Sequence, residues 1–157
     1  MISELLPKIS VETTKAMVIG SDEAGKGEWL GPIVVAAVAV SREQTYELQG
    51  EGVMNSKELS LTRIKELASF IRNHHYLTAH VIITPKRFNE LFNELKDERK
   101  TLNDLLAWGH SKAIEDVLNS LNVNARDVRV MIDEFDRIKT EERLRRDLDP
   151  NGFKSIR

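Results

Sequence analysis

Residues 17–32 read Met-Val-Ile-Gly-Ser-Asp-Glu-Ala-Gly-Lys-Gly-Glu-Trp-Leu-Gly-Pro and hold the strongest structural and chemical signals in the chain. Two adjacent carboxylates, Asp22 and Glu23, follow an apolar run that has the composition of a buried strand. The Gly-Lys-Gly sequence at 25–27 adds exposed backbone N–H groups and one positive charge within a few residues. This combination indicates a metal-dependent site for phosphodiester chemistry on a nucleic-acid backbone.

The composition is that of one folded domain without a strong global charge. A chain of 157 residues with 41% hydrophobic content supports one core, so we expect residues 1–157 to form a single domain. The 23 Lys and Arg against 25 Asp and Glu give a net charge of -2. Nucleic acid would therefore have to bind through a local basic patch rather than through the field of the whole protein.

The sequence contains neither cysteine nor a membrane-length apolar segment. Without cysteine, any metal must be held by oxygen or histidine ligands, and a reducing, cytoplasmic setting is favoured. The longest apolar run, residues 33–40, is far shorter than the ~18 residues that a membrane span requires. The N-terminus has no signal-peptide pattern, so we expect no membrane association.

Hydrophobic periodicity predicts an α/β fold, with strands concentrated early and helices later. The predicted strands are residues 17–21, 33–40, 76–83 and 128–132, and the predicted helices are residues 61–71, a short helix beginning at Pro85, and residues 101–121. Ser60 is the expected N-cap of the first helix, which we expect to pack on the sheet. The broad apolar stripe of the last helix is typical of a helix buried against a sheet.

Asp133 directly follows the last predicted strand. The long helix before that strand favours a parallel crossover, which would place the strand beside the first one and Asp133 near Asp22. Apposed carboxylates at strand ends suit two magnesium ions about 3.5–4 Å apart, which stabilise the attacking and leaving oxygens. Asp22, Glu23 and Asp133 are therefore the candidate catalytic and metal-binding residues.

Four segments carry a family resemblance, in order along the chain. They are Gly20–Gly27 with Gly31-Pro32, Asn55-Ser56-Lys57, Leu102–Ile114 and Ile132–Phe135. Together they resemble the motifs of type 2 ribonucleases H, the ribonuclease HII/HIII group, which cut RNA in RNA–DNA hybrids. Ser21 and the Leu-Leu-Ala-Trp-Gly-His sequence are closer to the HIII branch, whereas Gly-Lys-Gly is closer to the HII pattern, and we lean towards HIII.

The resemblance implies a ribonuclease H-like α/β fold with a five-stranded mixed sheet flanked by helices. It implies that Asp22, Glu23 and Asp133 are the first three ligands of a four-carboxylate site for Mg²⁺ or Mn²⁺. The implied substrate-binding residues are the loop facing the ribose 2′-hydroxyl and a phosphate-contacting element, namely Gly25, Lys26, Gly27, Ser56 and Lys57. The implied substrate is an RNA–DNA hybrid, and the implied state is a monomer.

The chain departs from the family pattern at two places. Asn55 stands where the family commonly has Asp, and no segment before Arg157 matches the fourth carboxylate with its alanine-rich helix. We therefore expect a domain that lacks its C-terminal third, with Asp136, Asp147 or Asp149 as alternative fourth ligands. A nucleic-acid-binding module without catalysis is the alternative function, and a scaffold fragment is disfavoured by the clustered carboxylates.

The histidines, the tryptophans and several basic residues are weaker candidates for function. The four histidines share no ligand spacing with the carboxylates and are expected to be structural: His74, His75, His80 and His110. Trp108 is expected in the core, while Trp29 is a candidate for substrate contact. A phosphate-binding rim is an alternative to scattered surface charge for Lys86, Arg87, Lys112, Arg137 and Lys139.

Overall fold

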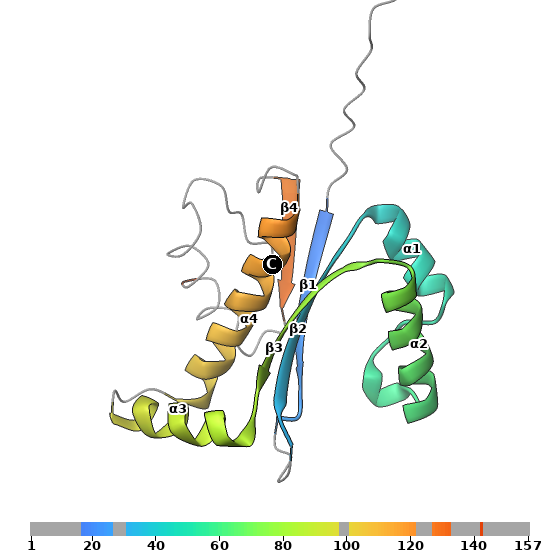
Figure 1. Ribbon diagram of the computed structural model, residues 1–157. Helices are drawn as coiled ribbons and strands as arrows, with labels where there is room; N and C mark the ends of the chain where they lie inside the picture. Colours follow the sequence, from blue (N-terminus) through green and yellow to red (C-terminus); the bar gives the residue numbers. More distant parts are fainter. Residues whose placement is uncertain (1–16, 27–30, 98–100, 122–126, 133–141, 143–157) are drawn as a thin grey trace, which may run out of the picture.

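The computed structural model describes residues 17–26, 31–97, 101–121, 127–132 and 142 (Figure 1). These residues form four strands, four α-helices and one 3₁₀ turn. In chain order they are β1 (Met17–Ala24), β2 (Ile33–Val40), α1 (Arg42–Gly50), η1 (Ser56–Glu58), α2 (Leu61–Asn73), β3 (Leu77–Ile83), α3 (Pro85–Asp97), α4 (Leu102–Ser120) and β4 (Val128–Ile132).

The sheet is mixed and has the strand order β3-β2-β1-β4. β1 pairs antiparallel with β2, and β2 pairs antiparallel with β3. β4 runs parallel to β1, with Ser21 opposite Ile132, so the predicted parallel crossover is confirmed. The resemblance implies five strands, whereas the described residues form four.

One face of the sheet is covered by α4, and this layer forms the main core (Figure 1). Alternate residues of β1 and β2 point to that face, as Ile19 and Val35 do. They share the core with Leu106 and Ile114 of α4, and all four are 0% exposed. Burying each such side chain contributes about 1.5–3 kcal/mol, so the packing of α4 adds substantially to the stability of the sheet.

Trp108 does not belong to this core. It lies on α4 but is 40% exposed, so the expectation of a core tryptophan was wrong. The stripe that α4 buries contains Leu106, His110 and Ile114, which succeed each other at intervals of four. Trp108 lies two residues from Leu106 and from His110, a spacing that points a side chain away from the helix face on which they lie.

Helices α1 and α2 lie on the opposite side of the sheet from α3 and α4 (Figure 1). Ser60 caps α2 as predicted, since its side chain accepts a hydrogen bond from the backbone N–H of Arg63. α3 begins at Pro85, also as predicted. A groove separates the Ala68 face of α2 from the sheet. Helix α2 therefore packs less closely on the sheet than we expected.

Helix α1 was not predicted, although its start carries a recognisable signal. Ser41 accepts a hydrogen bond from the backbone N–H of Gln44, and the Gln44 side chain accepts one from the Ser41 N–H. These reciprocal bonds form a capping box. None of the α1 residues is buried, so the segment has no apolar stripe that periodicity could detect.

Candidate active site

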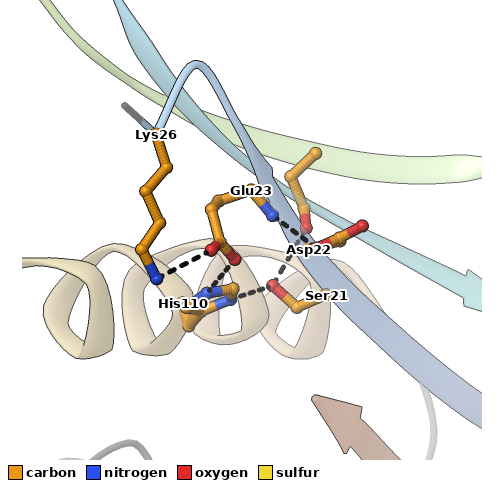
Figure 2. A network of polar contacts seen from close by, with 6 residues as sticks. Ser21, Asp22, Glu23, Lys26 and His110 are labelled. Atoms are coloured by element: carbon orange, nitrogen blue, oxygen red, sulfur yellow. Dashed lines mark hydrogen bonds and ion pairs between the residues drawn. The ribbon is translucent and has the colours of Figure 1, made fainter. Parts of the chain in front are cut away.

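Asp22 and Glu23 lie near the end of β1, and strand geometry points consecutive side chains to opposite faces. Asp22 is exposed, and its Oδ1 accepts a hydrogen bond of 2.9 Å from the backbone N–H of Glu23. The Glu23 side chain is only 16% exposed and points towards α4 (Figure 2). The two carboxylates therefore have different surroundings despite being neighbours.

Glu23 has a basic partner for each of its carboxylate oxygens. Its Oε1 lies 3.5 Å from Lys26 Nζ, and its Oε2 lies 3.3 Å from His110 Nε2 (Figure 2). Lys26 comes from the turn after β1, whereas His110 comes from the middle of α4. The Glu23 carboxylate thus contacts one residue that is close in the sequence, Lys26, and one that is distant, His110.

His110 is a functional candidate that the sequence interpretation missed. It is 1% exposed, and its Nδ1 lies 2.8 Å from Ser21 Oγ, which also donates a 2.9 Å hydrogen bond to the Ala36 carbonyl. The available signal was its position in the apolar stripe of α4, because a buried polar ring needs hydrogen-bond partners. Ser21 lies 89 residues away and cannot be identified from local spacing.

The turn after β1 requires glycine at position 25. Gly25 has a φ of +84°, and a Cβ atom there would lie 2.3 Å from the backbone carbonyl oxygen of Pro32. Both the backbone conformation and the lack of space therefore exclude a side chain. The close approach brings the Gly25–Lys26 segment against the start of β2.

A second polar segment, Asn55 to Lys57, forms a short exposed turn. The Asn55 Oδ1 accepts a 3.1 Å hydrogen bond from the backbone N–H of Lys57, and both Ser56 and Lys57 are exposed. An aspartate would offer an equivalent acceptor oxygen. The presence of Asn rather than Asp at position 55 therefore leaves this backbone bond intact.

These segments meet along one groove of about 1110 Å³ between the sheet and α2. Its polar end is lined by residues from two separate parts of the sequence, namely Asp22, Glu23, Gly25, Lys26, Asn55, Ser56 and Lys57. Asp22, whose side chain lies on the sheet face opposite to that of Glu23, and the exposed Lys57 thus border this space. Such a surface suits a phosphate chain that is bridged to carboxylates by a cation.

Several predicted residues lie outside the described part of the chain. They are Gly27, Trp29, Asp133, Asp136, Arg137, Lys139, Asp147 and Asp149. The last paired residues of the two parallel strands, Ser21 and Ile132, immediately precede Asp22 and Asp133 in sequence. Within the described residues alone, no group of three His, Asp or Glu side chains could hold a metal ion.

Two of the described basic residues of the proposed rim are engaged in local ion pairs. Arg87 lies 3.3 Å from Glu90, and Lys112 lies 2.9 Å from Asp116. The Asp116 and Glu115 carboxylates raise the pKa of Lys112. Neither basic residue lines the groove, which favours the interpretation of scattered surface charge.

The other three histidines are all exposed, and none has a recorded contact with Asp22 or Glu23 among the described residues. His74 ends α2, where its ring stacks on Phe70 at a centroid distance of 3.9 Å. His75 adopts a positive φ of 54° in the turn that follows, and His80 lies on β3. None of the three lines the groove, as expected for structural residues.

No helix within the described residues is long and apolar enough to cross a membrane.

Sequence comparison finds similarity to ribonucleases HII and HIII. The family model for Ribonuclease HII matches residues 19–151. Ribonuclease HIII of Protochlamydia amoebophila is 42% identical over 101 residues, covering 64% of this chain and 32% of that protein. Ribonuclease HII of Methanocaldococcus jannaschii is 33% identical over 117 residues, covering 74% of this chain and 48% of that protein. The chain thus spans a third to a half of the length of these two relatives.

Solved structures show the same fold. Bst-RNase HIII in complex with Mn²⁺ superimposes with a TM-score of 0.69 and 27% identity, over 91% of this chain and 43% of that one. The RNase HII of Archaeoglobus fulgidus in its complex with PCNA gives a TM-score of 0.59 and 32% identity, over 89% and 61%. The predicted ribonuclease H-like fold and the family resemblance are therefore confirmed. The chain belongs to the ribonuclease HII family.

Proposed function

We propose that this chain carries the catalytic core of a metal-dependent endoribonuclease that cuts the RNA strand of RNA–DNA hybrids. One observation carries the proposal: in a member of this family, the acidic end of β1, the Gly25–Lys26 turn and the Ser56–Lys57 turn line a single groove. A groove that combines carboxylates with lysines can bind a phosphodiester and a divalent cation together.

Asp22, Glu23 and Asp133 would hold Mg²⁺ or Mn²⁺. Carboxylate oxygens are the ligands that both ions prefer, and Asp22 and Glu23 already line the groove. In the sequence, Asp133 directly follows Ile132, the residue that is paired with Ser21. When bound, the ions activate water and stabilise the leaving oxygen. The related Bst-RNase HIII was solved with Mn²⁺.

The other groove residues would bind and orient the substrate. Lys57 and Lys26 supply positive charge to the phosphates, and Ser56 supplies a hydroxyl. The backbone of Gly25 allows close approach to the RNA strand, where a 2′-hydroxyl distinguishes RNA from DNA. We extend the proposal to a single domain that acts as a monomer in the cytoplasm.

Cleavage of a labelled hybrid tests this proposal. We expect the chain, with Mg²⁺ or Mn²⁺, to cut inside the RNA strand and leave 3′-hydroxyl and 5′-phosphate ends. A DNA duplex of the same sequence should remain intact, because it lacks the 2′-hydroxyl. A hybrid that stays uncut with both metals, or equal cutting of the DNA duplex, would refute the proposed activity or substrate.

A hybrid-binding module without catalysis is a second candidate. It is favoured by one observation, that Lys26 and Lys57 line the groove and can contact phosphates without a bound metal. In that case fluorescence anisotropy would detect hybrid binding without cleavage, and Asp22→Asn would leave the affinity unchanged. Loss of cleavage in Asp22→Asn with retained binding would instead favour the enzyme.

A further inference from the structure

We propose that His110 is a positioning residue that fixes the carboxylate of Glu23 for metal binding. The inference rests on the proposed function, in which Glu23 is a metal ligand. His110 lies on α4, outside both polar segments that line the groove, and it reaches Glu23 through the interior of the protein (Figure 2). It would act through Glu23, without itself contacting substrate or metal.

Ser21 holds one nitrogen of the ring. The Ser21 Oγ lies within hydrogen-bond distance of both the Ala36 carbonyl oxygen, at 2.9 Å, and His110 Nδ1, at 2.8 Å. Because Ser21 and His110 are both buried, these contacts fix the plane of the ring.

The fixed ring directs its other nitrogen at Glu23. Nε2 lies 3.3 Å from Oε2, a distance at which an Nε2–H group donates a hydrogen bond to the carboxylate. Because His110 is 1% exposed and the Glu23 side chain is 16% exposed, little water competes for this contact. A flexible glutamate that would otherwise sample several rotamers is thereby held in one orientation.

Close packing of α4 on β2 makes the reach possible. Gly109 precedes His110, and a Cβ atom at Gly109 would lie 2.9 Å from Val35 Cγ2. The missing side chain lets α4 approach the sheet closely at this point. The His110 ring consequently lies directly beneath the acidic end of β1.

A purely structural histidine would need only its bond to Ser21. The contact with Glu23 is the additional observation, because it joins the buried ring to a proposed ligand. Replacing a residue that orients a metal ligand in this way typically lowers the metal affinity by about 10–100-fold. Metal affinity is therefore the property that separates the two roles.

Mn²⁺ binding to the full chain, measured from the electron paramagnetic resonance signal of the free ion, tests the proposal. A glutamine amide reaches the position of Nε2, whereas an asparagine amide reaches that of Nδ1. We expect His110→Gln to keep most of the Mn²⁺ affinity, and His110→Asn to lose about 10-fold although it keeps the Ser21 bond. Exposed His74→Gln is the matched control and should bind Mn²⁺ like the wild type.

Thermal unfolding of each variant separates positioning from folding. The proposal is supported if His110→Asn is as stable as His110→Gln but binds Mn²⁺ more weakly. It is overturned if both variants bind like the wild type, if affinity merely follows stability, or if Glu23→Gln does not weaken Mn²⁺ binding. Failure of the proposed function appears in a different measurement, as an uncut hybrid despite Mn²⁺ binding that depends on Glu23.

Discussion

At the end of β1, one carboxylate is held by the protein and its neighbour is left accessible. Glu23 lies between Lys26 and His110, whereas Asp22 is exposed and accepts only the backbone N–H of Glu23 among the described contacts. An exposed carboxylate can bind a cation or the cation's water without first breaking a strong ion pair. Asp22 is therefore the residue whose substitution should affect metal binding most directly.

Gly25→Ala should destabilise the turn that carries Lys26. The positive φ and the 2.3 Å distance from an added Cβ to the Pro32 oxygen both oppose alanine, at a cost of about 1–3 kcal/mol. Urea unfolding measures this loss, and hybrid binding should weaken with it. Gly50→Ala is the matched control, because no atom lies within 4 Å of a Cβ at that position. Equal stability of the two variants would contradict the proposed steric requirement.

The residues of the site differ in how far they could be predicted. Asp22 and Glu23 stand out because adjacent carboxylates before a Gly-Lys-Gly sequence form a local pattern. The role of His110 depends on Ser21, Glu23 and the packing of α4 on the sheet, which are non-local. A single histidine in an apolar stripe carries too little local information to identify those partners.

At the scale of elements, the close contact between α4 and β2 brings His110 next to Glu23. Gly109→Ala should raise helix propensity by up to ~1 kcal/mol, yet its Cβ would lie 2.9 Å from Val35 Cγ2. We expect overpacking to dominate, with a net loss in the free energy of unfolding of about 1–2 kcal/mol.

The same steric clash should be relieved in a Val35→Ala background. Urea unfolding of the two single variants and the double variant gives the coupling energy, which we expect to be about 0.5–3 kcal/mol. If Gly109→Ala stabilises the protein equally in both backgrounds, α4 does not depend on this close approach.

Tyr76 links α1 to the start of β3 through a hydrogen bond from its hydroxyl to Glu47 Oε2. Burial, reinforced by this bond, raises the pKa of Tyr76 to about 12. A tyrosine in the unfolded chain ionises near pH ~10, so the stabilisation is complete below that pH and is lost as the pH rises towards 12.

Unfolding free energies at about pH 9 and about pH 11, on either side of the ordinary tyrosine pKa, test this linkage. We expect the wild type to lose more stability between these values than Tyr76→Phe, which lacks the titrating group. At neutral pH the variant should be less stable by about 1 kcal/mol through loss of the hydrogen bond. Parallel pH profiles for the two proteins would show that Tyr76 does not contribute.

The sequence predicted those helices and strands that bury one face, because burial of one face requires apolar residues at regular intervals. The four strands, α2 and α4 each bury one face, and their apolar spacing marks them in the sequence. α1 buries no residue, so only the Ser41–Gln44 capping box indicates it. The separation of α2 from the sheet could not be predicted, because an amphipathic pattern does not specify how closely its apolar face packs.

At the scale of the whole molecule, the topology unites residues that are far apart in sequence. The parallel pairing of β1 with β4 ends with Ser21 opposite Ile132, and the groove joins the end of β1 to the turn at 55–57. Chain order alone predicted the pairing, through the long helix before β4. The groove depends on the placement of α2, which sequence periodicity does not determine.

The rate of RNA cleavage in an RNA–DNA hybrid, compared between the wild type and Asp22→Asn at equal Mn²⁺, tests the central claim most directly. We expect the wild type to cut the RNA strand and the variant to lose at least ~100-fold in rate while it keeps the wild-type unfolding temperature, because an amide replaces a carboxylate ligand with a neutral one. Equal rates for the two proteins would contradict a metal site at the acidic end of β1.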